Sequence, residues 1–316
     1  MVIVHLVGGL GNQLFQYACG RSVALRWEKE RGRKVVFKLD LSAFQTHYTL
    51  HKYSLHHLCI KENIASQKEI AELRPVGKLG HLRALVDPWI KKRFEKTRFQ
   101  EKGLTFDRSI FEKKPPLYLE GYWQTEKYFN EIASVLREEF KVKTEPSSRN
   151  REWADRIAGC ESVSLHVRRA DYVSNNQTQS LHGTCDMGYY REAVAQMAKS
   201  VRNPHIFVFA DDPVWAAEHV RFDFPTFYVA DNNAETNYED FRLMSLCSHN
   251  IIANSTFSWW GAWMNPNPKK RVVAPRQWFQ DLSKDASDLV PENWVRIGNE
   301  EKRVIERGAA SMGCGN

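Results

Sequence analysis

The chain has 316 residues, of which 42% are hydrophobic and 26% charged, and this ordinary globular composition excludes a fibrous or disordered protein. At about 100–200 residues per domain, the length predicts two domains or one large one. No run of about 18 apolar residues predicts a membrane-spanning helix, and the N-terminus lacks the features of a signal peptide. The six cysteines lack the spacing of a zinc site or a redox dithiol, so we expect reduced thiols in a cytoplasmic protein.

The charge is unevenly distributed along the chain. Residues 1–150 contain 27 Lys and Arg against 17 Asp and Glu, whereas residues 151–316 contain 18 against 21. Residues 74–114 alone contain 12 basic and 5 acidic residues. This segment is either a solvated basic surface or one that contacts anionic lipid at the inner face of the membrane. No recognised nucleic-acid-binding module accompanies the charge, so no nucleic-acid partner is expected.

The first half opens with a strand, a glycine turn, a helix and a second strand. Apolar runs predict strands over residues 2–7 and 34–39, and periodic apolar residues predict a helix over 13–31 that Gly32 ends. This order is typical of a βαβ unit with a parallel sheet. Residues 61–114 are predicted to be mostly helical and irregular.

The alternation of strands and helices restarts after residues 144–148, which have the composition of a linker. Strands are predicted over residues 162–167, 205–210, 226–229, 250–253 and 271–274. Helices are predicted at residues 153–157, 187–201, 214–220, 238–247 and 259–264. We therefore predict an α/β protein of two doubly wound domains, residues 1–148 and 149–316. Such domains bind ligands at the carboxyl ends of their strands.

Two loops that follow strands contain groups suited to phosphate. Residues 8–13 (GGLGNQ) place three glycines where a strand becomes a helix, so the backbone can approach an anion closely. The alternative is a tight turn that only packs against the sheet. Residues 254–261 (NSTFSWWG) place small hydroxyl groups ahead of a helix, where they would either bind phosphate or cap the helix.

Adjacent arginines follow the strand predicted over residues 162–167. Strand alternation puts His166 and Arg168 on one face, with Arg169 at the strand end. Guanidinium groups placed there need anions, and a pyrophosphate suits their forked geometry. Asp171 follows them, either as a ligand-facing carboxylate or as the internal partner of an arginine.

Two carboxylates, Asp211 and Asp212, follow the strand predicted over residues 205–210. They would accept hydrogen bonds from a base edge or bind a metal, while Asp212 with Pro213 would equally well start a helix. The absence of any Asp-x-Asp motif disfavours a metal that carries a diphosphate. No carboxylate or cysteine stands among four clustered histidines, so we expect no metal there: His47, His51, His56 and His57.

Taken in order, these motifs resemble the bacterial α-1,2-fucosyltransferases of glycosyltransferase family 11. The resemblance lies in the segments 8–18 (GGLGNQLFQYA), 121–129 (GYWQTEKYF), 166–172 (HVRRADY), 209–212 (FADD) and 254–263 (NSTFSWWGAW). It runs from residue 1 to about 295, and the one visible departure is Ala170, where the family usually has glycine.

The resemblance implies a GT-B fold, in which two Rossmann-like domains face a central cleft. It also implies an inverting, metal-independent reaction without a cofactor. The donor would be GDP-β-L-fucose, bound by the second domain. The acceptor, bound by the first domain, would be the 2-hydroxyl of a terminal galactose in an oligosaccharide or surface-polysaccharide precursor. The alternatives are a transferase for another GDP-sugar, a dinucleotide-dependent oxidoreductase and a non-catalytic carbohydrate-binding module.

The resemblance further implies roles for single residues. Arg168 would hold the diphosphate, His166 would contact the guanine or ribose, and Asp211 or Asp212 would accept hydrogen bonds from guanine. The remaining donor-binding residues would be Gly9, Gly11, Asn12, Arg169, Ser255, Thr256 and Ser258. Because an inverting transfer needs a deprotonated acceptor hydroxyl, a general base is expected. Asp171 is the first candidate for it, ahead of Asp40 and His5.

Overall fold

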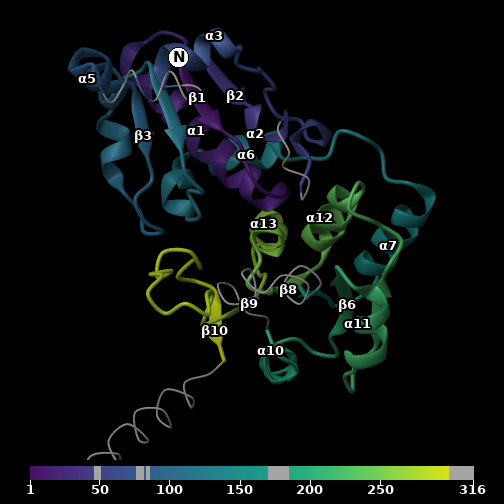
Figure 1. Cartoon of the computed structure of the whole chain (residues 1–316). Coiled ribbons are helices and arrows are strands. Elements are labelled where there is room, and N and C mark those ends of the chain that lie inside the picture. The colour runs from purple at the N-terminus through teal and green to yellow at the C-terminus, as the bar shows by residue number, and fades with distance from the viewer. Residues whose placement is uncertain (46–50, 76–81, 83–85, 170–184, 299–316) are drawn as a thin grey trace, which may run out of the picture. The chain divides into compact units, whose positions relative to one another are not determined.

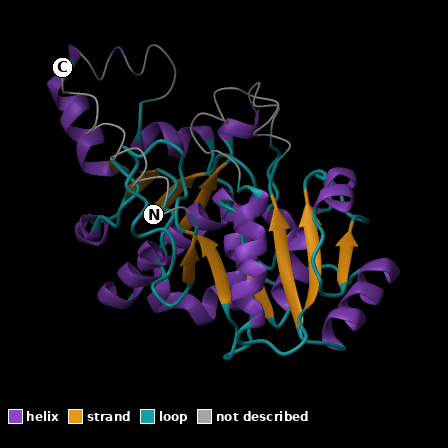
Figure 2. Cartoon of the chain, turned by 90° about the horizontal axis from the view of Figure 1, so that it is seen from below, coloured by secondary structure: helices purple, strands orange, loops and turns teal. Residues whose placement is uncertain are grey.

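The computed structural model describes residues 1–45, 51–75, 82, 86–169 and 185–298. The chain divides into two compact units, unit 1 (Met1–Glu145 with Lys284–Pro291) and unit 2 (Pro146–Ser283 with Glu292–Asn316). Each unit contains a parallel β-sheet with helices packed around it (Figure 1, Figure 2). The predicted α/β class with two Rossmann-like domains is confirmed.

In the described part of unit 1, the strands form a sheet in the order β2-β1-β4-β3. The strands are β1 (Val2–His5), β2 (Phe37–Asp40), β3 (Arg98–Gln100) and β4 (Leu117–Glu120). The α-helices are α1 (Leu10–Arg31), α2 (Ser42–Gln45), α3 (Gln67–Leu73), α5 (Pro88–Thr97) and α6 (Ala133–Glu139). The predicted strand–helix–strand opening is confirmed, although β3 and β4 lie where no strand was predicted.

Helix α1 approaches the sheet closely because it carries a glycine at the contact. A Cβ atom at Gly20 would lie 2.7 Å from a ring carbon of Phe37 and 3.0 Å from Val4 Cβ, so a larger residue would push the helix outward. At its end, Gly32 adopts φ 62°, a left-handed conformation that glycine tolerates without strain, and the helix stops there as predicted.

A buried ion pair fixes helix α1 to helix α6. Arg21 Nε and Nη2 donate to Glu139 Oε1 at 3.0 and 2.9 Å, and Tyr17 Oη donates to Glu139 Oε2 at 2.8 Å. All three side chains are buried. Because the loss of one partner would leave the other charge buried and uncompensated, this contact constrains how α1 and α6 pack.

In the described part of unit 2, the sheet order is β10-β9-β8-β5-β6-β7. The strands are β5 (Ser162–Val167), β6 (His205–Ala210), β7 (Thr226–Val229), β8 (His249–Ile251), β9 (Val272–Pro275) and β10 (Val295–Ile297). The helices are α7 (Ser148–Ala158), α10 (Met187–Ala198), α11 (Pro213–His219), α12 (Asn237–Leu246) and α13 (Thr256–Met264). The five predicted strands are confirmed, three of them with the predicted bounds, whereas β10 was not predicted.

Buried amides connect the centre of this sheet to two helices. Asn250 Nδ2 donates to Ser164 Oγ at 2.7 Å and to the Met244 carbonyl at 2.9 Å. Asn265 Nδ2 donates to Asn250 Oδ1 at 2.8 Å and to the Cys247 carbonyl at 2.7 Å. Because these buried polar groups have partners, they position β5, β8 and the ends of α12 and α13 without the cost of unpaired atoms.

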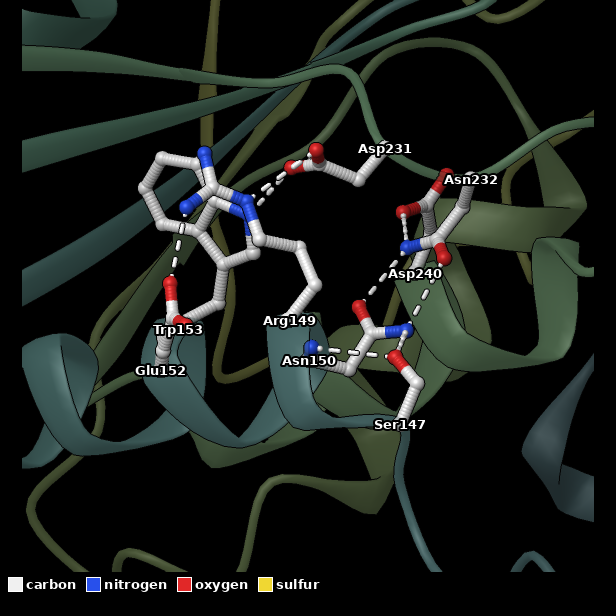
Figure 3. A network of polar contacts seen from close by, with 8 residues as sticks. All are labelled: Ser147, Arg149, Asn150, Glu152, Trp153, Asp231, Asn232 and Asp240. Atoms are coloured by element: carbon white, nitrogen blue, oxygen red, sulfur yellow. Dashed lines mark hydrogen bonds and ion pairs between the residues drawn. The ribbon is translucent and has the colours of Figure 1, made fainter.

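A second polar network joins the start of α7, the loop after β7 and helix α12 (Figure 3). Asn232 Nδ2 donates to Asp240 Oδ1 at 2.7 Å and to Asn150 Oδ1 at 3.1 Å, and Asn150 Nδ2 donates back to Asn232 Oδ1 at 3.0 Å. Beside them, Trp153 Nε1 donates to Asp231 at 2.6 Å. Burial, the largest effect, raises the pKa of Asp240 to about 7.

This raised pKa predicts a pH dependence of stability. The folded chain holds a proton on Asp240 that the unfolded chain releases near pH 3.8, so the folded state loses stability as the pH rises through about 7. In Asp240→Asn, a neutral amide still offers Asn232 an acceptor. We therefore expect the wild type to lose unfolding free energy, relative to Asp240→Asn, between about pH 4 and about pH 7, and to show no further loss at higher pH.

Urea denaturation at each pH measures this difference. Asp155→Asn, on the exposed side of α7, is the matched control and should follow the wild type. Parallel pH profiles for the wild type and Asp240→Asn would contradict the prediction.

Candidate active site

The order of strands in unit 2 marks where a ligand would bind. The chain starts at β5 and adds β6 and β7 on one side, then β8, β9 and β10 on the other. The order therefore reverses between β5 and β8. In open parallel sheets, ligands bind at the carboxyl ends of the strands that flank such a reversal. The loops at this point are residues 168–169, at the end of β5, and residues 252–255, after β8.

A buried histidine lies at the end of β5. His166 is buried, and its ring centroid lies 5.7 Å from that of Phe257 on α13. Burial and the neighbouring Arg168 lower the pKa of His166 to about 3, so the imidazole is neutral near pH 7. Its Nδ1 atom is buried and makes no hydrogen bond to any residue that the structure describes. A buried polar atom of this kind is satisfied when a ligand or water reaches it.

Asp211 joins the ends of β5 and β6. Its carboxylate Oδ2 lies 3.4 Å from Arg168 Nε, and its Oδ1 accepts a hydrogen bond from the Arg169 backbone N–H at 2.9 Å. The Arg169 guanidinium lies over the ring of Trp215, 4.1 Å from its centroid. The two arginines and Asp211 therefore lie together, as their positions after neighbouring strands predict.

Asp212 has a different environment from its neighbour. Its Oδ1 accepts a hydrogen bond from the Trp215 N–H at 3.1 Å, and Pro213 occupies the first position of α11. Asp212 is thus the N-cap of this helix, which is the helix-starting alternative that the sequence left open.

The loop after β8 leads into helix α13. Ser255 is the N-cap residue by position, but its side chain makes no capping hydrogen bond. Ser258 Oγ donates to the Ser255 carbonyl at 3.2 Å, and Thr256 is the first residue of the helix. Asn254 Nδ2 donates to the Trp278 carbonyl at 3.2 Å, which holds the loop against the unit. The N-terminus of α13 and its hydroxyl groups therefore lie at the carboxyl edge of the sheet.

The glycine turn of unit 1 follows β1. Gly8 has φ 79°, and a Cβ atom there would lie 2.6 Å from Asn12 Nδ2, so only glycine fits this position. Gly9 is the N-cap of α1, and Gly11 is buried in the first turn of that helix. Asn12 Oδ1 accepts a hydrogen bond from Gln124 Nε2 at 3.0 Å, which joins this turn to the loop after β4.

Two buried glutamines on α1, which sequence reasoning did not place in the site, hold this turn. Gln13 Nε2 donates to the carbonyls of Gly8 at 2.8 Å and Lys52 at 2.9 Å. Gln16 Oε1 accepts from the Val7 N–H at 2.9 Å, and its Nε2 donates to the Gly121 carbonyl at 3.2 Å. The sequence feature that could have identified them is a pair of glutamines, three residues apart, directly after the glycine turn.

A polar row crosses the carboxyl edge of the unit 1 sheet. Asp40, His5 and Glu120 end three adjacent strands, and Glu120 is in register with Gln100 of β3. The Arg74 guanidinium bridges the row, with nitrogens 3.6 Å from Asp40 Oδ2 and 3.0 Å from Glu120 Oε1. His5 therefore lies between two carboxylates, but burial is the largest effect and lowers its pKa.

The candidate bases thus differ in position. Asp40 is completely buried and accepts hydrogen bonds from Tyr118 Oη and the Ser42 N–H, so it holds the sheet edge together. His5 is partly exposed. Asp171 lies outside the described residues, as does His47 of the histidine cluster.

Two further features are described for residues 1–45, 51–75, 82, 86–169 and 185–298. Among them, no three His, Cys, Asp or Glu side chains come together as a group that could hold a metal ion. No helix formed by these residues is long and apolar enough to cross a membrane.

Comparison with known proteins places the chain in a family. It matches the family described as Glycosyl transferase family 11 over residues 1–298. It is 34% identical over 311 residues to an α-1,2-colitosyltransferase of Escherichia coli, covering 94% of this chain and 99% of that protein. It is 32% identical over 311 residues to the O-antigen biosynthesis glycosyltransferase WbnK of Escherichia coli, covering 92% and 99%.

Among solved structures, the fucosyltransferase NodZ from Bradyrhizobium is similar, with a TM-score of 0.46 and 14% identity over 90% of this chain and 95% of that one. The family match spans both units, and the relatives align over nearly their whole length. The chain therefore belongs to glycosyl transferase family 11 and is a glycosyltransferase.

Proposed function

We propose that the chain transfers L-fucose from GDP-β-L-fucose to the 2-hydroxyl of a terminal galactose, with inversion and without a metal. The observation that carries this proposal is the carboxyl edge of the unit 2 sheet. Two arginines, a neutral buried histidine and the N-terminus of α13 lie at the ends of adjacent strands there. These groups suit an anionic nucleotide, since guanidinium groups and helix N–H donors both bind phosphate.

The relatives support the acceptor and the linkage. The colitosyltransferase of Escherichia coli is named for an α-1,2 linkage. The galactoside 2-α-L-fucosyltransferase SEC1 of Bos taurus is 26% identical over 139 residues, which is 43% of this chain. We therefore propose a galactose-terminated glycan as the acceptor, in an oligosaccharide or a surface-polysaccharide precursor.

In this mechanism, the leaving GDP gains negative charge in the transition state. Donors fixed at the position of that charge lower the barrier itself, because they bind the transition state more strongly than the bound substrate. Arg168, oriented by Asp211, would bind the diphosphate in a forked geometry. Ser255, Thr256 and Ser258, at the start of α13, would add donors to the same phosphates.

The other donor contacts extend the same proposal. His166, neutral and with its buried Nδ1, would contact the guanine or ribose. Asp211 or Asp212 would accept hydrogen bonds from guanine, and each carboxylate also accepts one backbone N–H, from Arg169 and from Trp215 respectively. Arg169 would add positive charge beside the diphosphate.

The second group of proposed contacts comes from unit 1. We propose that the two units form a GT-B enzyme, in which unit 2 binds the donor and unit 1 binds the acceptor. Gly9, Gly11 and Asn12 would then contact the diphosphate and fucose from the glycine turn. Asp171 is the proposed general base.

A transferase for another GDP-sugar is the second candidate, and one relative favours it. Colitose is L-fucose without its 3-hydroxyl, and the colitosyltransferase is 34% identical to this chain. The groups proposed to bind GDP would hold a GDP-sugar with either sugar, because they contact the nucleotide. Membership of a glycosyltransferase family removes the support for an oxidoreductase or a non-catalytic binding module.

The proposed reaction is tested with chelator-treated enzyme. The enzyme is incubated with GDP-β-L-fucose or GDP-colitose and a panel of β-galactosides, and the linkage and anomeric configuration of the product are determined. We expect α-1,2-linked fucose on galactose, at the same rate with and without EDTA. Transfer that stops with EDTA or reaches another hydroxyl would contradict the proposal, and turnover of GDP-colitose alone would establish the second candidate.

The role of Arg168 predicts the effect of two substitutions. Arg168→Ala should lower kcat by about a hundredfold or more, or ~3 kcal/mol, since a fixed donor to the leaving group is lost. Arg168→Lys should also be severely impaired, because an ammonium group cannot form the fork. Steady-state kinetics with saturating donor measure both, and Arg202→Lys, at an exposed position of the same unit, is the control. Near-wild-type turnover in Arg168→Lys would refute the forked contact.

A further inference from the structure

Helix α5 packs against unit 1 by one side. It precedes the edge strand β3 and lies beside it (Figure 1). Ile90 and Phe94, one turn apart, are only partly exposed, and Thr97 Oγ1 donates to the Leu73 carbonyl at 2.8 Å. This side therefore attaches the helix to α3 and to the sheet.

The opposite side of α5 is exposed and combines apolar with basic side chains. Trp89 is 87% exposed, and Val86, just before the helix, is 72% exposed. Lys92 and Lys96 follow Trp89 at spacings of three and seven residues, so they lie on the same side of the helix. A single exposed apolar side chain is ordinary on a protein surface, but here two lie three residues apart beside a basic row, and exposed apolar groups rimmed by polar residues mark interaction sites.

Trp89 lies in the first turn of α5, and hydrogen bonds cap the backbone of this turn. Asp87 is the N-cap, and its Oδ1 accepts from the Trp89 N–H at 2.8 Å and the Ile90 N–H at 3.3 Å. Pro88 occupies the first helical position, where its fixed φ favours the helix. The backbone thus holds the indole outward at the start of the helix.

The charge of α5 favours an anionic partner. The helix carries one acidic residue, Glu95, against four basic residues: Lys91, Lys92, Arg93 and Lys96. Tryptophan is enriched at the level of lipid headgroups, where its ring is apolar and its N–H is hydrated. Lysines beside it attract anionic headgroups, and the attraction falls with ionic strength.

We propose that the outer side of α5 binds an anionic lipid bilayer, with Trp89 and Val86 in the headgroup region and the lysines on lipid phosphates. This surface, defined as Val86, Trp89, Lys92 and Lys96, would bring unit 1 to the membrane. An acceptor glycan carried on a lipid would then be concentrated near it. Vesicle binding needs neither donor nor acceptor, so this proposal stands or falls separately from the transfer reaction.

The test is cosedimentation of the full chain with vesicles of phosphatidylcholine alone or mixed with phosphatidylglycerol. We expect binding only to the anionic vesicles, weakened by added salt. Lys92→Glu with Lys96→Glu should lower the partition coefficient by about tenfold or more. Trp89→Ser should weaken binding with little change in its salt dependence, because it removes the apolar contact and leaves the charge. The melting temperature and far-UV circular dichroism of these variants should match those of the wild type, which shows that they fold.

Matched controls lie elsewhere on the chain. Leu282→Ser removes another exposed apolar side chain, 64% exposed, and Lys269→Glu with Lys284→Glu reverses two other exposed lysines. These controls should bind vesicles as the wild type does. Equal binding by the α5 variants and the wild type, or no binding by the wild type, would overturn the proposal. A dimer in sedimentation equilibrium that the α5 variants dissociate would assign the surface to a second copy and also overturn it.

Discussion

A guanidinium group beside a carboxylate, at the ends of two neighbouring parallel strands, is the contact on which the candidate site depends. Arg168 directly follows β5 and Asp211 directly follows β6, and the pairing of these strands brings Arg168 Nε within 3.4 Å of Asp211 Oδ2. The carboxylate also accepts the Arg169 N–H, so one acidic side chain orients the backbone and the cation together. An arginine restrained in this way loses little further freedom when an anion arrives, which is the basis of electrostatic preorganisation.

The glycine turn of unit 1 is held by different means. The hydrogen bonds that Gln13 and Gln16 make to this turn involve no charged group. The buried amides of these two side chains also bond to the backbone of two distant loops. Neutral amides suit this task because they satisfy backbone groups without adding a buried charge. The arginines of unit 2 thus fit the proposed binding of the nucleotide there, and the uncharged turn of unit 1 fits its proposed contacts with fucose and, through backbone N–H groups, with the diphosphate.

Much of the fold could be predicted because its signals are local. Apolar runs located β5, β6 and β7 to the residue, and the loops after strands were correctly placed, so that Arg168, Asp211 and Ser255 lie at the carboxyl edge of one sheet. β3 and β10 were missed because three residues each are too few to show a periodicity, and β4 was missed although it is as long as β7. The glutamine contacts were also missed, because Gln13 meets Lys52 and Ser54 about forty residues away and Gln16 meets Gly121, 105 residues away. Asp211 and Asp212 are adjacent in sequence, and only side-chain geometry separates the ion pair from the helix cap.

The central claim is that cations of the polypeptide, rather than a divalent ion, bind the diphosphate of the nucleotide. It is tested most directly by a crystal structure of the enzyme with GDP, grown in the presence of a chelator and again with Mg²⁺. The account predicts that in both crystals the Arg168 guanidinium lies within hydrogen-bond distance of diphosphate oxygens, at the N-terminus of α13. A guanidinium that points away from the nucleotide, or a diphosphate held through a metal ion, would contradict it.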